Sequence, residues 1–522
     1  MKSCSSIFND VIGPVMTGPS SSHTAGCARI GRMTRLLYGR DISRAEIIFD
    51  EQGSYVSTYI GQGSNYGFAG GLMGFAPEDY RLKDAITLAH DEGREFVFKK
   101  ADINAGHPNE ARINILEENG ELAMTVLTRS VGGGMFEIIE MDGFLVDIKG
   151  DRESVFIAAD RSAAEEIASL FCHVPIKTET KDNTVLFTID DVKKLSDTSI
   201  EEAEKNTGVR YVRRAEIILP AAVREKPNPP FINAGEAMCY AAEHNCSLWE
   251  LAVHYETGVV DITPEGIFEK GYGILRAMRK SSAIYKPEEV PTTGFLGPQA
   301  YSMAEKMKKR KIADAGILNR GMLWAVAVME NNCIHNIVVA APTAGSCGVI
   351  PAAIVAAGED MGLSDEQIVK GLLVSGLVGA FIANQATFGA EVAACQAENG
   401  AASAMAAAGV AQLLEASVEE GFNAASIAMQ NLLGLICDPV GGLTETPCIS
   451  RNVAALSNAV MSANMALCGF DGFIPLDEVI QTMMTVGKML PREFRCTCEG
   501  GLCSTPTAER IDAELKLKRE TL

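Results

Sequence analysis

The heptapeptide EKPNPPF, residues 225–231, divides the chain into two parts of different character. It carries three prolines, and proline fixes φ and removes a backbone donor, so the segment continues neither a helix nor a central strand. The sequence before it mixes strand and helix patterns. The sequence after it is rich in helix formers, as in ASAMAAAGVAQLLEASVEEG at 402–421. We therefore predict a multidomain protein with a Pro-rich linker at 223–231 and a large all-α C-terminal domain at 232–522.

The part before the linker is predicted to contain two domains. Residues 151–218 follow the order strand, helix, strand, strand, helix, strand, which is the split βαββαβ pattern. This order is typical of an ACT-like module, and we place one at 148–222. Its first strand-to-helix turn, AADRSAAEE, lacks the glycine of many ligand-binding ACT domains, which favours a structural or dimer-forming role. Residues 1–147 are assigned to an α/β domain.

Composition excludes several classes of partner. The net charge of -21 and the pI near 4.9 argue against nucleic acid and anionic membranes. The start, MKSCSSIFND, has no secretory pattern, so we expect a cytoplasmic protein in which the 14 cysteines stay reduced. A metal or cluster site is then one explanation for them. The apolar run at 371–390 is interrupted by Asn384 and Gln385 and indicates a buried core helix.

Two polar loops in the N-terminal part could carry chemistry. TGPSSSHTAG, residues 17–26, offers hydroxyls and backbone N–H groups suited to a carboxylate or phosphate, with His23 as a proton acceptor and Thr24 as a further hydroxyl. The alternative is a polar turn that caps the following helix. GHPNEARI, residues 106–113, places His107 before a proline on an extended or turn segment, where it is either an acid–base group or a surface histidine.

Three cysteines in helix-breaking segments could form a metal centre. Cys395 lies in ACQAENG, and Cys437 and Cys448 bracket CDPVGGLTETPC. The close CxxC pairs typical of zinc are absent, whereas three thiolates without an obvious fourth suit an iron–sulfur cluster with one open iron. By spacing alone, buried core cysteines near a turn are the favoured explanation of the pattern. RCTCEGGLCSTP, residues 495–506, contains further thiols that could be ligands, a redox pair or inert: Cys496, Cys498 and Cys503.

Together these stretches resemble the iron–sulfur-dependent L-serine dehydratases. TGPSSSHTAG, GGLMGFAPEDYR, HPN and SVGGGMFEIIEMDG are similar to the β part of that family. APTAGSCGVIPAA, CQAENGAASAMAAAG, GLICDPVGGLTETPCISRN and EGGLCSTPT are similar to its α part. The motifs follow the same order over nearly the whole chain, with the β part first and the ACT-like module between the two.

The resemblance implies a [4Fe–4S] cluster on Cys395, Cys437 and Cys448. Its open iron would act as a Lewis acid on the β-hydroxyl of L-serine, and the products would be pyruvate and ammonia. His23 or His107 would remove the α-proton, with Thr24 beside them, and the chain is expected to form a homodimer. The expected substrate-binding residues are Ser20, Ser21, Ser22, Asn109, Thr343, Gly345, Ser346, Arg451 and Asn452.

Departures from the family pattern leave the substrate open. GQGSN at 61–65 replaces the family's GHGTD, and RCTC at 495–498 places Cys496 where an acid is usual. One alternative is a cluster-dependent lyase for another β-hydroxy or β-thiol acid. Another is a non-catalytic thiol or ACT-like sensor. A C-terminal cysteine ligand known in some members is absent from the ending KRETL, and Cys498 or Cys503 could replace it.

Overall fold

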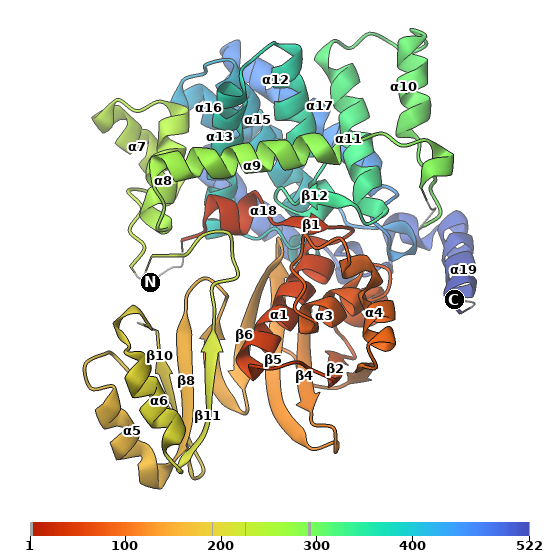
Figure 1. The fold of residues 1–522 in the computed structure, drawn as a ribbon. Coiled ribbons are helices and arrows are strands. Elements are labelled where there is room, and N and C mark those ends of the chain that lie inside the picture. The colour runs from red at the N-terminus through yellow and green to blue at the C-terminus, as the bar shows by residue number, and fades with distance from the viewer. Residues whose placement is uncertain (1–3, 191, 225, 291–293, 521–522) are drawn as a thin grey trace.

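The computed structural model describes residues 4–190, 192–224, 226–290 and 294–520. A six-stranded sheet with its helices and a four-stranded sheet with two helices lie side by side below a large helical part (Figure 1). The molecule is therefore multidomain, with sheets in its N-terminal part and helices in its C-terminal part, as the change of pattern at the linker predicts.

The six-stranded sheet forms the centre of the N-terminal domain, in the order β3-β2-β4-β5-β6-β7. β2 and β3 are parallel, and the other neighbouring pairs are antiparallel. Buried and partly exposed residues alternate along β5, because one face of the sheet covers an apolar core. The elements are α1 (Gly26–Tyr38), β2 (Arg44–Asp50), α2 (Tyr55–Thr58), α3 (Ser64–Leu72), α4 (Ala85–Asp91), β3 (Glu95–Ala101), β4 (Glu110–Leu116), β5 (Leu122–Gly132), β6 (Met135–Met141) and β7 (Phe144–Ile148).

The four-stranded sheet has the predicted βαββαβ order and is antiparallel throughout, with the strand order β11-β8-β10-β9. β8 is buried along nearly its whole length because its two faces cover different cores. Val155 and Ile157 pack with the module's own helices, whereas Phe156 and Ala158 join the core of the N-terminal domain. The elements are β8 (Ser154–Asp160), α5 (Ala164–Leu170), β9 (Lys177–Lys181), β10 (Thr184–Ile189), α6 (Asp197–Lys205) and β11 (Val209–Ala215).

Helix α13 (Asp365–Gln385) runs through the centre of the helical part, and its residues from Gly371 to Ile382 are buried. By length and composition it could cross a membrane, but most of its apolar window is enclosed by other helices, as in a core helix. The prediction of a buried helix at 371–390 is confirmed for residues 371–382; the helix ends at Gln385, so residues 386–390 lie outside it. Ser364 caps α13, and Ser417 caps α16 in the same way, each with a glutamine or glutamate three positions on.

The other helices of this part pack around α13 or lie farther from it at the edge of the helical part. They are α7 (Ala234–His244), α8 (Leu248–Val259), α9 (Pro264–Ser281), α10 (Ala300–Lys308), α11 (Ile317–Cys333), α12 (Ala357–Asp360), α14 (Ala390–Ala393), α15 (Ala401–Leu413), α16 (Val418–Gln430), α17 (Cys448–Leu467), α18 (Leu476–Met489) and α19 (Pro506–Glu520).

The prediction that the C-terminal domain is all-α is wrong in one detail, since it contains the strand β12 (Ile337–Val339). These β-branched residues pair antiparallel with β1 (Val15–Thr17) from the start of the chain. Ile7 and Val11, which precede β1, are buried in the core of the helical part. The first residues of the chain therefore join the helical part, and the pairing sets the polar loop at 17–26 beside the loop that follows β12.

The predicted linker at 223–231 packs against the helical part. Val223 forms an isolated antiparallel bridge with Val260, and Phe231 is buried between aromatic rings of the helices. Glu225 lies outside the described residues. The prolines end regular structure here, as expected, while the apolar residues beside them anchor the segment.

Candidate active site

A cavity of about 560 Å³ lies where the N-terminal domain meets the helical part. Its walls come from the serine-rich turn after β1, the loop after β12 and the loops that carry the thiols. Segments that are hundreds of residues apart in the sequence thus enclose one space. The predicted site residues that line it are Ser20, Ser21, Ser22, His23, Thr343, Gly345, Cys437 and Cys448.

The serine turn and the loop after β12 form one continuous wall. Ser20 Oγ accepts a hydrogen bond from His23 N at 3.1 Å, which caps the short π-helical turn that follows. Ser21 Oγ accepts one from Ala344 N at 3.3 Å. Asn332, in α11, donates its amide to backbone carbonyls of both segments. The hydroxyls are therefore presented from a wall with fixed geometry.

His23 is buried, and both of its ring nitrogens contact hydroxyls. Nδ1 lies 2.9 Å from Ser22 Oγ, and Nε2 lies 3.3 Å from Ser54 Oγ. Burial lowers the pKa of His23 to about 3, so the imidazole is neutral near pH 7. A neutral ring has one nitrogen lone pair, so His23 can accept a proton in this cavity.

Cys437 and Cys448 line the other side of the cavity, and Cys395 lies beside Cys437 without being one of the described lining residues. Cys395 Sγ, Cys437 Sγ and a carboxylate oxygen of Glu398 all lie within 4.8 Å of one another. Cys448, the first residue of α17, lines the same cavity. Burial and then the neighbouring Cys395 raise the pKa of the Cys448 thiol well above its usual value. A metal ion would replace the proton on a buried thiol of this kind, because thiols bind metals in their deprotonated form.

The loop between Cys437 and Cys448 turns at two glycines. Gly441 and Gly442 have φ of 64° and 69°, a left-handed conformation that only glycine adopts at little cost. The chain therefore reverses within a few residues, and both cysteines reach the same cavity.

Arg451 and Asn452 lie in α17 behind the thiols and are not among the described residues that line the cavity. Arg451 Nη1 contacts Asp438 Oδ1 at 2.7 Å and Cys395 Sγ at 3.8 Å. Arg451 therefore places a positive charge beside the sulfur of Cys395. Asn452 donates to the carbonyls of Gly345 and Cys448 at 2.8 and 2.9 Å. Both residues therefore position the walls.

Other predicted residues are near the cavity without lining it. Thr24 is buried and donates to the carbonyl of Gln62 at 2.8 Å, so its hydroxyl holds the GQGSN loop. His107 is partly exposed, and its Nδ1 accepts the N–H of Asn109. Ser346 is fully buried and bonds within its own loop. The sequence could not decide whether His23 or His107 is the base. Of the two, only His23 is among the described residues that line the cavity.

Two carboxylates in the cavity were missed by the sequence interpretation, although both flank Cys395 in AEVAACQAENG. Glu398 Oε1 accepts the Thr343 hydroxyl at 2.7 Å, and burial raises the pKa of Glu398 to about 7. Glu391 Oε1 accepts Asn109 Nδ2 at 3.0 Å, and burial raises the pKa of Glu391 as well. An acid three or four residues from a candidate ligand is the signal that could have found them.

A further thiol, Cys496, lines the cavity and was not assigned a role. Its N–H donates to the carbonyl of Cys437 at 3.2 Å, which fixes the segment beside the thiol-bearing loop. Cys498 and Cys503 instead both donate to the carbonyl of Pro439, at 3.6 and 3.2 Å. Of the thiols in RCTCEGGLCSTP, Cys496 is therefore the one that reaches the cavity.

Comparisons with known proteins agree with this arrangement. Residues 243–503 match the family model described as serine dehydratase alpha chain. The probable L-serine dehydratase alpha chain of Bacillus subtilis is 34% identical over 287 residues, which is 55% of this chain and 95% of that protein. The probable beta chain of the same organism is 45% identical over 152 residues, 29% of this chain and 67% of that protein. The L-serine dehydratase of Haemophilus influenzae is 28% identical over 510 residues, 93% of this chain and 96% of that protein. The chain therefore belongs to the serine dehydratase family, with alpha-type and beta-type sequence fused in one polypeptide.

Proposed function

We propose that this chain is an L-serine ammonia-lyase that converts L-serine to pyruvate and ammonia with a [4Fe–4S] cluster. The observation that carries the proposal is the single cavity that joins a hydroxyl-rich turn, a buried histidine and the gathered thiols. Relatives that span nearly the whole chain and carry the name L-serine dehydratase support it.

The thiols fit the proposed cluster. Cys395, Cys437 and Cys448 would hold it, because two of their sulfurs already lie within 4.8 Å of one another and the third lines the same space. Three cysteines would bind three of the four irons. The fourth iron would be free to act as a Lewis acid on the substrate β-hydroxyl when the cluster is bound. Arg451, beside Cys395, offsets part of the negative charge of the thiolates.

The residues opposite the thiols would bind and deprotonate the substrate. The hydroxyls of Ser20, Ser21 and Ser22 suit its carboxylate. His23 would take the α-proton at Nδ1, since Ser22, which contacts that nitrogen, lines the cavity whereas Ser54 beside Nε2 does not. A bound carboxylate raises the pKa of a nearby imidazole, which makes His23 a stronger base in the complex than in the empty site.

The remaining steps require water and no further group. Loss of the α-proton and the β-hydroxyl gives an enamine and one water molecule. The enamine rearranges to an imine, and one water hydrolyses the imine to pyruvate and ammonia.

Anaerobic reconstitution tests the proposal. Loaded protein should release pyruvate from L-serine, as detected with lactate dehydrogenase and NADH, and should lose activity in air. Protein with a full complement of iron and sulfide that releases no pyruvate would contradict the proposal. The matched variant is Cys437→Ala, which should lose iron and turnover together.

A cluster-dependent lyase for a different β-hydroxy or β-thiol acid is the second candidate. Gln62, from the divergent GQGSN segment, and Cys496, from RCTC, both line the cavity, so the two departures occur at the site itself. A substrate panel on loaded protein distinguishes the candidates, because this alternative fails if L-serine is by far the best substrate. A non-catalytic sensor would keep its ligand response after Cys437→Ala.

The domain boundaries are part of the same proposal: 1–147, 148–222, 223–231 and 232–522. We propose that the module at 148–222 is ACT-like and structural. One face of its sheet is buried against the N-terminal domain through Phe156, Ala158 and Leu186, which leaves that face closed to effectors. Its outer strands β9 and β11 would be available to a second copy of the chain in a homodimer.

A further inference from the structure

The charges around the cavity are unusual for a site that binds a carboxylic acid. Glu391 and Glu398 line it, while none of the described lining residues is a lysine or arginine. The only lining histidine among them, His23, is held neutral by burial. The described walls therefore carry acceptors for a cation on one side and hydroxyl donors for an anion on the other.

Glu391 occupies a distinct position in this arrangement. It lines both the cavity and a second, outer space of about 930 Å³ that is bordered by Ser54, Arg492 and Arg495. The outer space is lined by charges of both signs, since Glu51 and Glu499 border it together with the two arginines. Among the described lining residues, the inner cavity has carboxylates but no lysine or arginine, and Glu391 lies at the boundary between the two spaces.

The contacts of Glu391 leave it able to bind a donor. One oxygen accepts the amide of Asn109 at 3.0 Å, and among the described residues no other side chain donates to this carboxylate. Asn109 is fully buried, and its Oδ1 has no hydrogen-bond partner among the described residues. A buried acceptor without a donor costs about 1–3 kcal/mol, so the Glu391–Asn109 pair favours a ligand that brings several N–H groups.

Glu398 is less suited to this role. Thr343 already donates to its Oε1, and the Cys395 thiol lies 3.9 Å from its Oε2. Glu398 is therefore committed to the thiol side of the cavity. Glu391 is four residues before Cys395 and contacts the N-terminal domain instead.

We infer that Glu391, positioned by Asn109, binds the α-ammonium group of the substrate and so selects an α-amino acid over the same β-hydroxy acid without the amine. The inference rests on the proposed function and deepens it by naming the substrate class. The ammonium group donates to the Glu391 carboxylate, while the substrate carboxylate faces the hydroxyls of Ser20 and Ser22 across the cavity. The β-hydroxyl then points to the thiols.

The test compares two ligands that differ only in the amine, L-serine and 3-hydroxypropanoate. Binding to anaerobically loaded protein is measured by calorimetry, for the wild type and for Glu391→Gln, which keeps the shape and removes the charge. Glu391→Gln should weaken L-serine binding by about tenfold or more, the value of a charge-assisted hydrogen bond, and should leave 3-hydroxypropanoate binding unchanged. The KM for L-serine should rise in parallel, with iron content and spectrum unaltered.

Two further variants keep the result interpretable. Glu391→Asp retains the charge and should recover part of the affinity. Glu419→Gln, at an exposed carboxylate in the first turn of α16, removes the same charge elsewhere and should change neither ligand. If Glu391→Gln folds and loads its cluster but keeps the wild-type ratio of the two affinities, the inference is wrong while the proposed function stands. If loaded wild-type protein neither binds nor converts L-serine, both fail. Binding of L-serine without turnover would contradict the proposed function alone.

Discussion

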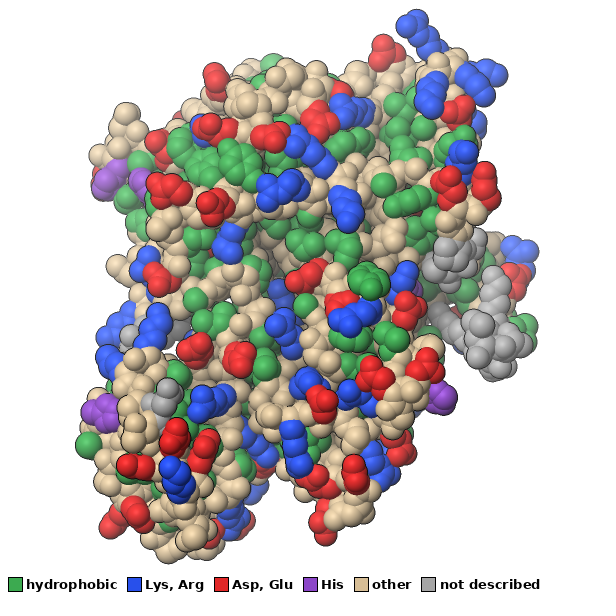
Figure 2. Space-filling view, in the orientation of Figure 1, with side chains coloured by type: hydrophobic (Ala, Val, Ile, Leu, Met, Phe, Trp, Pro, Cys, Tyr) green, Lys and Arg blue, Asp and Glu red, His purple; other side chains and the backbone are tan. Residues whose placement is uncertain are grey.

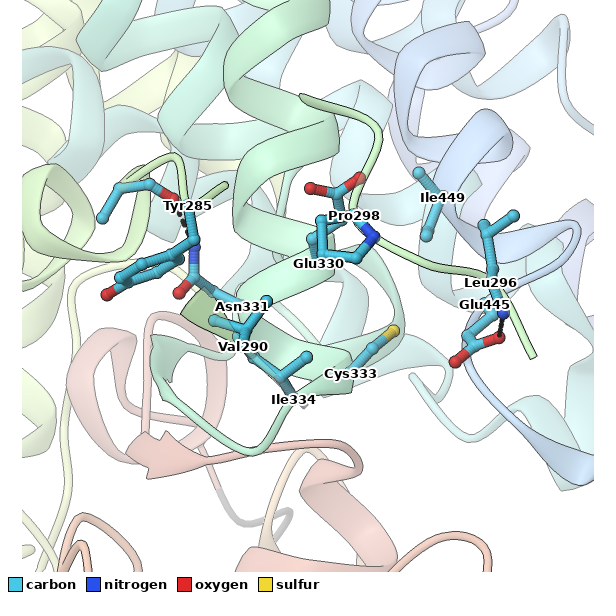
Figure 3. A pocket seen from close by; sticks show the side chains of 11 residues that line it. Tyr285, Val290, Leu296, Pro298, Glu330, Asn331, Cys333, Ile334, Glu445 and Ile449 are labelled. Atoms are coloured by element: carbon cyan, nitrogen blue, oxygen red, sulfur yellow. Dashed lines mark hydrogen bonds between the residues drawn. The ribbon is translucent and has the colours of Figure 1, made fainter. Parts of the chain in front are cut away.

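Two cavities flank the loop between Cys437 and Cys448, and both are lined by two carboxylates and by at least one cysteine. One is the candidate active site. The other, of about 440 Å³, is lined by mainly apolar residues together with Glu330, Cys333 and Glu445 (Figure 3). The two regions therefore use similar side chains at similar depth.

The two cavities differ in the groups that donate hydrogen bonds to their carboxylates. In the second cavity Glu445 accepts the backbone N–H groups of Phe295 and Leu296, and Glu330 accepts those of Gln299 and Ala300. Those carboxylates join chain segments, as helix caps do. In the candidate site the carboxylates accept side-chain donors instead, from Asn109 and Thr343. Burial alone does not distinguish a functional acid from a structural one, whereas the identity of its donors does.

The largest expected effect concerns the thiols of the two cavities. Cys437→Ala should remove the cluster and lower turnover by more than about 100-fold, since loss of a metal ligand exceeds the effect of losing a residue behind one. Cys333→Ala, in the second cavity, should keep iron and activity and cost about 1–2 kcal/mol of stability. Iron and sulfide analysis with pyruvate release measures both. Equal losses in the two variants would break the comparison.

The histidines test whether lining the cavity matters more than lying near it. His23→Asn should lower kcat by about 100-fold or more, the usual contribution of a general base. His107→Asn should stay within about threefold of the wild type, because His107 lies on a partly exposed loop outside the lining. Steady-state kinetics on loaded protein with equal iron content decides it. A larger loss in the His107 variant would reverse the assignment of the base.

A third prediction compares one carboxylate from each cavity, Glu398 in the candidate site and Glu445 in the second cavity. Glu398→Gln should lower kcat/KM by about 10-fold or more with little change in Tm, because its donors are side chains at the cavity. Glu445→Ala should leave kcat/KM nearly unchanged but lower stability by about 1–3 kcal/mol, because two backbone N–H groups lose their acceptor. Kinetics and thermal unfolding are measured on both. A stability loss in Glu398→Gln that matched that of Glu445→Ala would remove the distinction.

A pH dependence of stability is expected at a third buried carboxylate, Glu256, which accepts the Ser6 hydroxyl and the N–H groups of Ile7 and Phe8. Burial raises the pKa of Glu256 to about 7. In the unfolded chain this carboxyl loses its proton near pH 4.5, so between about pH 4.5 and 7 the folded state binds more protons. Its contribution to stability therefore falls as pH rises through that window, by at most about 3 kcal/mol.

Glu256→Gln, which cannot ionise, is the matched variant for this effect. The Tm of the wild type should decrease relative to the variant between pH 5 and 7, and the difference should level off above about pH 8. Parallel Tm curves over the whole range would show that Glu256 stays ionised when folded. In that case the hydrogen bonds from the Ser6 hydroxyl and from the N–H groups of Ile7 and Phe8 stabilise the ionised carboxylate by more than its burial destabilises it.

Much of the fold could be predicted because short contiguous sequence patterns indicate where its helices and strands lie. The order strand, helix, strand, strand, helix, strand was expected over 151–218 and is found from β8 to β11. The caps at Ser364 and Ser417 are likewise local, since each pairs a serine with a glutamine or glutamate three positions on. The strand β12 was missed because three residues carry too little pattern to outweigh the helices around them.

The candidate site could be predicted only in part. Cys395, Cys437 and Cys448 were identified from their loops and from the family resemblance, because glycine, proline and cysteine mark such segments locally. The choice between His23 and His107, and the presence of Glu391 and Cys496 in the cavity, could not be read in the same way. Those facts depend on distances between segments, which no local pattern contains.

By itself, then, the sequence determined the order of the elements, the division at the linker and the residue types of the site, because each depends on neighbours along the chain. The tertiary structure alone decided which of those residues share one space. Ser21 and Ala344 are 323 positions apart and are in contact only because β1 pairs with β12. That pairing is a long-range contact, and it sets the hydroxyl turn, the histidine and the thiols around a single cavity.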